Sequence, residues 1–272
     1  MSEVDQHLPL LEPRDHLLTE GRQPALLLAV GRAADGVVEE IKAAGGQAAA
    51  NYGSVTSRED AEAMVKTALD NFGKLDILIA NAGILRDKSF KNMDDGMWDA
   101  VIDVHLRGTY LTTKVAYDQM IEQGEGGRIV VTSSTSGLLG NFGQTNSGAA
   151  KAGIAGFMRC LWLEGVKYGI TVNVLAPTAT SRMTTDILPE NVQDKFPPEA
   201  VSPPIVWLCT DEAKDVSGRQ FLVGGNSVSL LSLQVTPIAK RDLLDGVWGV
   251  EEIGEKILES REAWPPINPM RG

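Results

Sequence analysis

An alternation of short apolar runs with amphipathic segments begins at residue 25 and continues to residue 223. This alternation is typical of a parallel β-sheet whose strands are joined by crossover helices. The predicted strands are residues 25–30, 47–52, 75–80, 128–132, 171–175 and, as the last strand, 219–223. The predicted helices are residues 34–44, 57–72 with Ser57 as N-cap, a long and broken helical region at 94–124, 146–168 and 241–261. The intervals are short and no repeat is present, so we expect one continuous sheet.

Composition narrows the classes of function. The 272 residues carry a net charge of −11 and no run of lysine or arginine, which argues against a nucleic-acid or anionic-membrane binding protein. The N-terminus lacks the pattern of a signal peptide and no apolar run is long enough to cross a membrane, so we expect a cytoplasmic protein. Cys160 and Cys209 lie in apolar segments and are predicted to be core thiols. The three dispersed histidines give no metal-ligand spacing.

The segment from residue 127 to 155 has the most distinctive order of residues. An apolar strand ends on Ser133 and Ser134, a Gly-rich crossing loop follows, and the next helix carries Lys151 in its first turns. Ser147 lies thirteen positions after Ser134 and one helical turn before Lys151. The segment therefore places two hydroxyl groups and one ammonium group where a strand passes into a helix.

Four stretches of sequence resemble the short-chain dehydrogenase/reductases: KLDILIANAGILRDKSF, DVHLRGTYLTT, TSSTSGLLGNFGQTN and APTATSRMT. Within that superfamily they are most similar to the (3R)-hydroxyacyl-CoA dehydrogenase domain of multifunctional enzyme type 2, the 17β-hydroxysteroid dehydrogenase type 4 group. The resemblance covers roughly residues 25–223 and implies a single α/β domain of Rossmann type, with a doubly wound parallel sheet. We therefore divide the chain into an atypical N-terminal segment (1–24), the Rossmann domain (25–230) and a C-terminal extension with one helix (231–272).

The resemblance also assigns roles to residues. In this family a Tyr gives or takes the substrate proton, a Lys one turn later lowers the pKa of that Tyr and holds the nicotinamide ribose, and a Ser orients the substrate carbonyl. Ser134 and Lys151 match the Ser and the Lys, but Ser147 stands in the Tyr position. A Ser hydroxyl has a pKa far above that of a phenol, so it cannot make the same proton transfer near neutral pH. His105 stands where many members have Asn, although the multifunctional-enzyme group resembles this chain in having His there.

Three features that bind the dinucleotide in this family are also missing. A Gly-rich turn after the first strand lets backbone amides approach the pyrophosphate, whereas the residues before position 25 contain a single glycine, Gly21. The acidic residue expected after the next strand is replaced by Gly31 and Arg32, and the Asp expected beside the adenine is Gly53. The strand-end motif beside the cofactor remains as Asn81, Ala82 and Gly83. We therefore expect a degenerate first strand and phosphate turn, and no bound cofactor.

We favour the hypothesis of a catalytically silent homologue that acts as a structural or regulatory subunit of a hydroxyacyl-CoA-dehydrogenase-like oligomer. In the resembling family the helices corresponding to residues 94–124 and 146–168 form a tetramer interface, and here both carry more apolar and aromatic residues than one buried face needs. We expect a homo-oligomer, or a hetero-oligomer with an active paralogue. The segments 141–144 and 181–184 are expected around a remaining cleft that binds an acyl-CoA or a cyclic small molecule.

Two alternatives stay open. In the first, the chain is a redox-neutral enzyme, such as a cyclase, dehydratase or lyase, whose old substrate pocket is lined by His105, Ser134, Ser147 and Lys151, with Lys151 as a base. In the second, it is an atypical NAD(P)-dependent oxidoreductase acting on a 3-hydroxyacyl-CoA or a steroid-like alcohol. The same residues also have structural interpretations: Lys151 as a solvated or salt-bridged helix residue, Ser134 as a strand-end cap, and His105 as a hydrogen-bonded structural residue.

Overall fold

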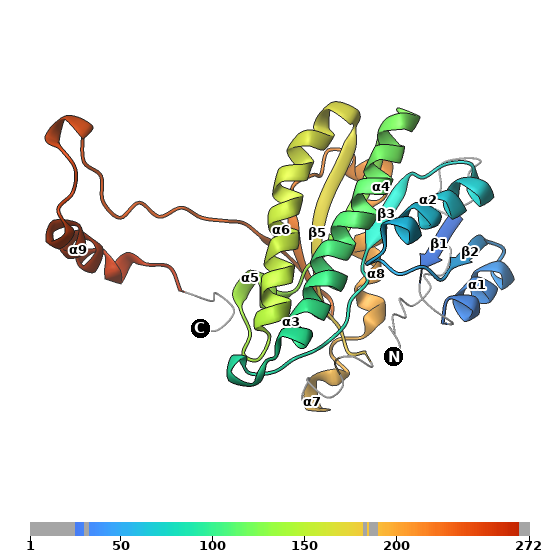
Figure 1. The fold of residues 1–272 in the computed structure, drawn as a ribbon, viewed down its shortest axis with the longest axis horizontal. Coiled ribbons are helices and arrows are strands. Elements are labelled where there is room, and N and C mark those ends of the chain that lie inside the picture. Colours follow the sequence, from blue (N-terminus) through green and yellow to red (C-terminus); the bar gives the residue numbers. More distant parts are fainter. Residues whose placement is uncertain (1–24, 30–32, 182–183, 185–189, 267–272) are drawn as a thin grey trace. The chain divides into compact units, whose positions relative to one another are not determined.

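A computed structural model of the chain describes residues 25–29, 33–181, 184 and 190–266. The chain divides into one compact unit that ends at Leu231 and a second that begins at Ser232. The first unit is an α/β fold in which strands and helices alternate along the chain, as predicted (Figure 1). The atypical segment 1–24, Gly21, Gly31 and Arg32 lie outside the described residues.

The described strands and helices of the first unit follow the predicted order closely. The strands are β1 (Ala25–Ala29), β2 (Gln47–Asn51), β3 (Ile77–Ala80), β4 (Gly127–Thr132), β5 (Ile170–Thr178), β6 (Gln220–Gly224) and β7 (Ser227–Leu231). The helices are α1 (Ala33–Ala43), α2 (Arg58–Phe72), α3 (Asp95–Val101), α4 (Gly108–Gln123), α5 (Thr135–Leu139), α6 (Thr145–Gly165), α7 (Glu190–Gln193) and α8 (Ser202–Leu208). Short α5, α7 and α8 were not predicted, and α5 occupies the segment predicted as a crossing loop.

The sheet differs from the predicted one in two respects. Strands β3, β4, β5 and β6 pair in parallel in that order, but β1 and β2 form a separate parallel pair, and no described strand joins β1 to β3. The prediction of one continuous sheet is therefore wrong for the described residues. The prediction that 219–223 is the last strand is also wrong, because β7 returns antiparallel to β6 through a tight turn in which Gly225 has a φ of 54°.

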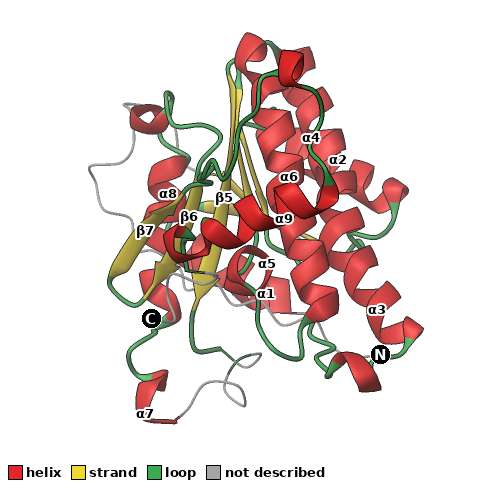
Figure 2. Cartoon of the chain, turned by 90° about the vertical axis from the view of Figure 1, so that its left-hand side faces the viewer, coloured by secondary structure: helices red, strands yellow, loops and turns green. Residues whose placement is uncertain are grey.

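Helices cover both faces of the main sheet (Figure 2). The core lies on both faces of β4 and β5. On one face, Ile129 and Val172 are fully buried against Ile154 and Met158 of α6 and Met120 of α4. On the other face, Val130 and Leu175 pack against α8. Each fully buried aliphatic side chain of this kind contributes about 1.5–3 kcal/mol of transfer free energy. This double cover confirms the doubly wound architecture and holds the ends of β3 and β4 in place.

Capping side chains fix the helices that precede the site. The Asp60 N–H donates to Ser57 Oγ at 3.1 Å, which confirms Ser57 as the N-cap of α2. The Met97 N–H donates to Asp94 Oδ1 at 2.7 Å at the start of α3. Between α3 and α4 the chain forms a π-helical segment, Ile102–Arg107, which is the predicted break in this helical region. That segment carries His105.

The second unit contains helix α9 (Val250–Glu259), which is shorter than the predicted helix 241–261. Gly246 has a φ of 82°, a left-handed conformation that interrupts the chain between Arg241 and α9. The Arg241 guanidinium lies 4.0 Å from the ring centroid of Trp248 and pairs with Glu252. None of the described helices combines the length and the apolar composition that crossing a membrane requires.

Candidate functional site

The carboxyl end of β4 carries two serines with different partners. The Ser133 hydroxyl is buried and donates to the backbone carbonyl of Lys151 at 2.9 Å. Ser134 is half-buried and is the N-cap of α5, where its Oγ accepts from the Ser136 N–H at 3.2 Å and from the Ser136 hydroxyl at 3.0 Å. Ser134 therefore fits the cap interpretation, and its hydroxyl already accepts two hydrogen bonds from its own turn.

Lys151 points into the fold rather than into solvent. Its side chain is buried, and Nζ donates to the Thr132 backbone carbonyl at 2.7 Å. The Thr132 hydroxyl in turn donates to Asn81 Oδ1 at 2.9 Å, which ties the end of β4 to the end of β3. Burial lowers the pKa of Lys151 to about 7. The interpretation of Lys151 as a solvated or salt-bridged residue is therefore wrong, since no carboxylate of the described chain pairs with it.

A close helix crossing holds the Lys151 backbone beside α5. A Cβ added to Gly137 would stand 2.5 Å from Lys151 Cβ and 2.6 Å from the backbone nitrogen of Ala152. Real Cβ atoms do not approach that closely, so only glycine allows α5 to contact α6 at this point. Gly137 belongs to the Gly-rich segment that predicted a loop, but it allows α5 to contact α6 next to Lys151.

His105 is buried in the π-helical segment. Its Nε2 lies 2.8 Å from the Ile84 carbonyl and 3.1 Å from the Ile84 nitrogen, while Nδ1 is buried with no hydrogen-bond partner among the described residues. Burial, followed by the charge of Lys151, lowers the pKa of His105 to about 4. The imidazole is therefore neutral near pH 7, and its contact with the backbone after β3 fits a structural role.

Ser147 lies in the first turns of α6, one turn before Lys151, and is buried. Its backbone N–H donates to Asn146 Oδ1 at 2.7 Å, and Asn146 Nδ2 donates to the Arg86 carbonyl at 2.9 Å. The fold thus places a small hydroxyl side chain at the interior position where the resemblance expects a phenol. The positive charge of Lys151 is one cause of the lowered pKa of His105. The Ser134 hydroxyl, in contrast, takes part in the N-cap of α5.

Sequence reasoning missed Asp87. Gln144 of the expected cleft loop donates through Nε2 to Asp87 Oδ2 at 2.6 Å, and Asn141 Nδ2 donates to Gln144 Oε1 at 3.0 Å. Asp87 Oδ1 is buried and without a hydrogen-bond partner in the described structure. The sequence feature that could have indicated Asp87 is an acidic residue shortly after the Asn81–Gly83 motif.

The other segment expected around the cleft is residues 181–184. There, Thr184 Oγ1 donates to the Ala179 carbonyl at 2.6 Å, while residues 182–183 are not described.

The described residues crowd the position where the resemblance expects the Asp beside the adenine. A Cβ at Gly53 would stand 2.8 Å from Asp60 Cβ, and the Ser54 N–H donates to Asp60 Oδ2 at 2.7 Å. The space for the missing adenine-binding Asp is therefore taken by Asp60. The retained strand-end motif braces this end of the sheet, since Asn81 accepts from Thr132 and Gly83 lies against His105. Lys151 directs its ammonium to the protein backbone, so we derive no step through this cofactor.

Two surface pockets lie away from these residues, and the described chain holds no cluster of metal ligands. Two surface pockets, of about 400 and 280 Å³, are lined by residues of α4, α6 and the turn after α6, and neither includes His105, Ser134, Ser147 or Lys151. No three His, Cys, Asp or Glu side chains of the described residues group as a metal site would require. Cys160 is exposed and Cys209 is half-buried, so the prediction of a core thiol is wrong for Cys160.

Comparison with known proteins agrees with the fold. Residues 14–194 match the sequence profile of the short chain dehydrogenases. A Mycobacterium tuberculosis protein named as a short-chain type dehydrogenase/reductase is 50% identical over 200 residues, covering 74% of this chain and 69% of its own. Mouse peroxisomal multifunctional enzyme type 2 is 44% identical over 237 residues, covering 86% of this chain but only 32% of the longer enzyme.

A solved structure shows the same architecture. The crystal structure of a short chain dehydrogenase from Mycobacterium avium superposes with a TM-score of 0.78 at 37% identity, covering 91% of this chain and 88% of that one. The sequence match spans the described strands β1 to β5 together with the site residues from Asn81 to Lys151. The chain therefore belongs to the short-chain dehydrogenase family.

Proposed function

We propose that this chain is a non-catalytic member of its family that serves as a structural or regulatory subunit of a hydroxyacyl-CoA-dehydrogenase-like oligomer. One observation carries the proposal: Ser147 replaces the phenol that would exchange a proton with substrate, and Lys151 turns its ammonium onto the Thr132 carbonyl. Without a phenol to activate, Lys151 completes a hydrogen-bonded link between α6, β4 and Asn81. In this proposal, Lys151, Thr132 and Asn81 are kept for their structural contacts.

The proton chemistry supports the same conclusion. A general acid or base works best when its pKa lies near the operating pH, and a Ser hydroxyl is far outside that range. His105 does not substitute for the phenol, because its Nε2 contacts the Ile84 backbone and its pKa is lowered to about 4. At Gly53, the Asp60 side chain crowds the space where an Asp would contact the adenine, so that cofactor contact is missing as well.

The surface of α4 and α6 supports a role in assembly. These helices lie side by side on one face of the sheet (Figure 1), and the large side chains of Tyr110, Leu163 and Val166 on and just after them are exposed. Exposed apolar side chains of this kind favour association. We propose that the partner is a second copy of this chain or an active dehydrogenase of the same family.

Cofactor binding is the first test. Calorimetric titration of the purified chain with NADH and with NADPH is expected to give no saturable heat, for the wild type and for Ser147→Tyr alike. The Ser147→Tyr variant is the matched probe, because it returns the phenol while leaving the occupied Gly53 position unchanged. Micromolar binding by the wild type together with oxidation of a 3-hydroxyacyl-CoA or a steroid-like alcohol would instead establish an NAD(P)-dependent oxidoreductase.

Assembly is the second test. Size-exclusion chromatography with light scattering is expected to show an oligomer of this chain, or a complex when it is coexpressed with an active dehydrogenase of the family. Replacing Leu163 by Glu on the exposed face of α6 is expected to shift the elution toward the monomer. A wild-type monomer that captures no coexpressed relative would contradict the subunit role.

The chemistry of Lys151 favours a second candidate, a redox-neutral enzyme such as a dehydratase, cyclase or lyase. A buried amine with a pKa lowered to about 7 is in part neutral at pH 7 and could remove a proton from carbon. The test is turnover of 3-hydroxyacyl-CoA thioesters without added nicotinamide, followed by the absorbance of the enoyl product. Turnover that is lost in Lys151→Met and retained in the exposed-lysine control Lys66→Met would support this candidate over the silent subunit.

A further inference from the structure

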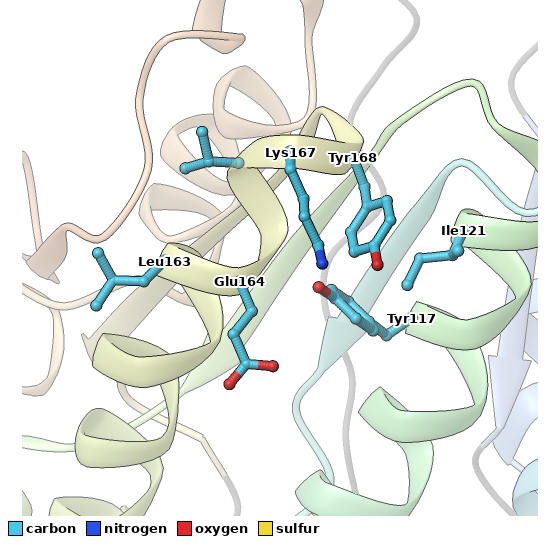
Figure 3. Close-up of a pocket in the computed structure, with 7 residues that line it drawn as sticks. Tyr117, Ile121, Leu163, Glu164, Lys167 and Tyr168 are labelled. Carbon is cyan, nitrogen blue, oxygen red and sulfur yellow. The ribbon is translucent and has the colours of Figure 1, made fainter.

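Three polar side chains near the carboxyl ends of β3 and β4 are almost fully enclosed, yet each has an unused hydrogen-bonding position. His105, Ser147 and Lys151 are 4%, 5% and 6% exposed. None of them lines the surface pocket drawn in Figure 3, which belongs to the side of α4 and α6 that we assign to assembly. An enclosed polar group without a partner is costly, and in native proteins it often indicates a water, an ion or a ligand.

The Lys151 ammonium has no counter-charge among the described residues. It donates to the Thr132 carbonyl at 2.7 Å, and no carboxylate of the described chain pairs with it. An ammonium group has three donors, so two remain for another acceptor. Buried charges in native proteins are normally paired, because an unpaired charge loses its hydration without replacement. An anion beside Lys151 would supply the missing charge.

The Ser147 hydroxyl is a second donor on the same face of α6, because Ser147 and Lys151 are one helical turn apart. The Ser147 backbone N–H donates to Asn146, whereas its hydroxyl has no hydrogen-bond partner in the described structure. Ser147 is also the third residue of α6, where the positive end of the helix dipole favours negative charge. Two donor groups are therefore open to one acceptor.

His105 contributes an acceptor rather than a donor. Its Nε2 lies closer to the Ile84 carbonyl (2.8 Å) than to the Ile84 nitrogen (3.1 Å), and a carbonyl oxygen can only accept, so the ring proton belongs on Nε2. The pKa of about 4 keeps the imidazole neutral near pH 7, so Nδ1 carries a lone pair. Nδ1 is buried and has no partner in the part of the chain that is described. A ligand that reaches Nδ1 must therefore donate to it.

His105 and Lys151 come from elements that pack against each other. A Cβ added to Gly153 of α6 would stand 3.0 Å from Leu106 Cδ1 of the π-helical segment, so these elements touch within two residues of both side chains. The charge of Lys151 also contributes to the lowered pKa of His105, which places the two groups within electrostatic range. One small ligand can therefore contact both.

We propose that these three side chains bind a small monoanion that carries one hydroxyl group of its own, with bicarbonate as the simplest example. Its anionic oxygens would accept from the Lys151 ammonium and the Ser147 hydroxyl, and its O–H would donate to His105 Nδ1. An ion of a few atoms suits groups that are this enclosed. The inference goes beyond the proposed function and does not depend on it, because binding an anion requires neither a nicotinamide nor turnover.

Two ions of similar size and shape test the charge and the hydroxyl group separately. Bicarbonate and nitrate are both planar monoanions, but only bicarbonate has an O–H. Thermal unfolding of the full chain is followed near pH 8 at constant ionic strength, with either ion replacing the much larger gluconate. We expect a dissociation constant for bicarbonate on the order of 10 mM and a midpoint raised by about 3–5 °C at about 100 mM bicarbonate. Nitrate should bind at least about fivefold more weakly.

Matched variants locate the ion. Lys151→Met removes the cation and should abolish the shift caused by bicarbonate, while Ser147→Ala removes one donor and should weaken binding by about fivefold. The exposed-residue controls Lys66→Met on α2 and Ser229→Ala on β7 should keep the full shift. Carbon-13 NMR with labelled bicarbonate detects the bound ion directly, and circular dichroism establishes that each variant is folded.

Three results would overturn the proposal. If bicarbonate does not stabilise the folded wild type relative to gluconate, these groups hold water only. If nitrate binds as tightly as bicarbonate, His105 Nδ1 does not accept a hydrogen bond from the ligand. If labelled carbon is found as a covalent carbamate on Lys151, by carbon-13 NMR and mass spectrometry, the lysine is a modification site instead of part of an anion site.

Discussion

The imidazole of His105 lies directly against the backbone of Gly83. A Cβ added to Gly83 would stand 2.7 Å from His105 Cε1 and 3.3 Å from Nδ1. The imidazole ring is held in that position by the Ile84 backbone, so it has little room to move away. The strand-end motif after β3 and the π-helical segment before α4 are therefore fitted to each other through a glycine.

Gly83→Ala is expected to destabilise the fold by about 1–3 kcal/mol, because the added methyl group overpacks the contact with His105. Urea unfolding followed by circular dichroism measures the change. Gly36→Ala in α1 is the matched control, since a Cβ there meets no atom within 4 Å, and it should stabilise the chain by about 0.5–1 kcal/mol. Equal effects of the two substitutions would contradict a specific role of the Gly83 contact.

The buried ammonium of Lys151 should make stability depend on pH in the alkaline range. Its pKa is about 7 in the folded chain and 10.5 in the reference state, so between these values the unfolded chain binds more protons than the folded chain. Stability should therefore rise with pH in this window, by at most about 1.4 kcal/mol per pH unit, and the contribution should be lost as pH falls toward 7. Lys151→Met should remove this slope between pH 7.5 and 9.5, whereas Lys66→Met should retain it.

His105 should make stability depend on pH in the acid range. Its pKa is about 4 in the folded chain against an ordinary value of 6.5, so the unfolded chain binds the extra proton between these values. The contribution to stability is complete above pH 6.5 and is lost as pH falls toward 4. His105→Asn should flatten this part of the stability curve. An NMR titration should also find a higher pKa for His105 in Lys151→Met, because the Lys151 charge is the second cause of the shift.

The alternation of strands and helices was predictable because the spacing of apolar residues along the chain differs between a helix and a strand. The N-cap Ser57 and the break before α4 were also predictable, because both depend on residues that are close together in the sequence. Strand β7 was missed although Gly225 and Asn226 form a two-residue turn signal ahead of an alternating segment. The separation of β1 and β2 from the other strands depends on pairing between distant segments, which local patterns do not encode.

The candidate site was predictable in its residues but less so in their contacts. The positions of Ser134, Ser147 and Lys151 relative to β4 and α6 follow from their spacing along the chain. The direction of the Lys151 ammonium, the cap formed by Ser134 and the involvement of Asp87 depend on how α5 and the loop after β3 pack in three dimensions. The exposure of Cys160 has the same origin, since α6 is apolar on more than the face that it buries.

Returning the missing Asp at position 53 should cost stability without restoring a cofactor site. The added Cβ would stand 2.8 Å from Asp60 Cβ, and the new carboxylate would lie beside the existing one. Gly53→Asn is the matched control, because it adds nearly the same volume without charge. We expect Gly53→Asp to be less stable than Gly53→Asn, with a difference that shrinks as salt is added. Calorimetry with NADH should show no binding to either variant, and binding by Gly53→Asp would contradict our assignment of this position.

The two cysteines should differ strongly in reactivity. Cys160 is exposed on α6, whereas burial raises the pKa of Cys209 to about 11, so only about one in a thousand Cys209 side chains is a thiolate at pH 8. Thiol titration with Ellman's reagent under native conditions should show one fast-reacting group, and Cys160→Ser should abolish it. Cys209→Ser should leave the fast phase intact, and both thiols should react in denaturant. A fast phase that survives Cys160→Ser would mean that the β4 and α8 side of the fold opens to the reagent, because Cys209 follows directly after α8 in that packing.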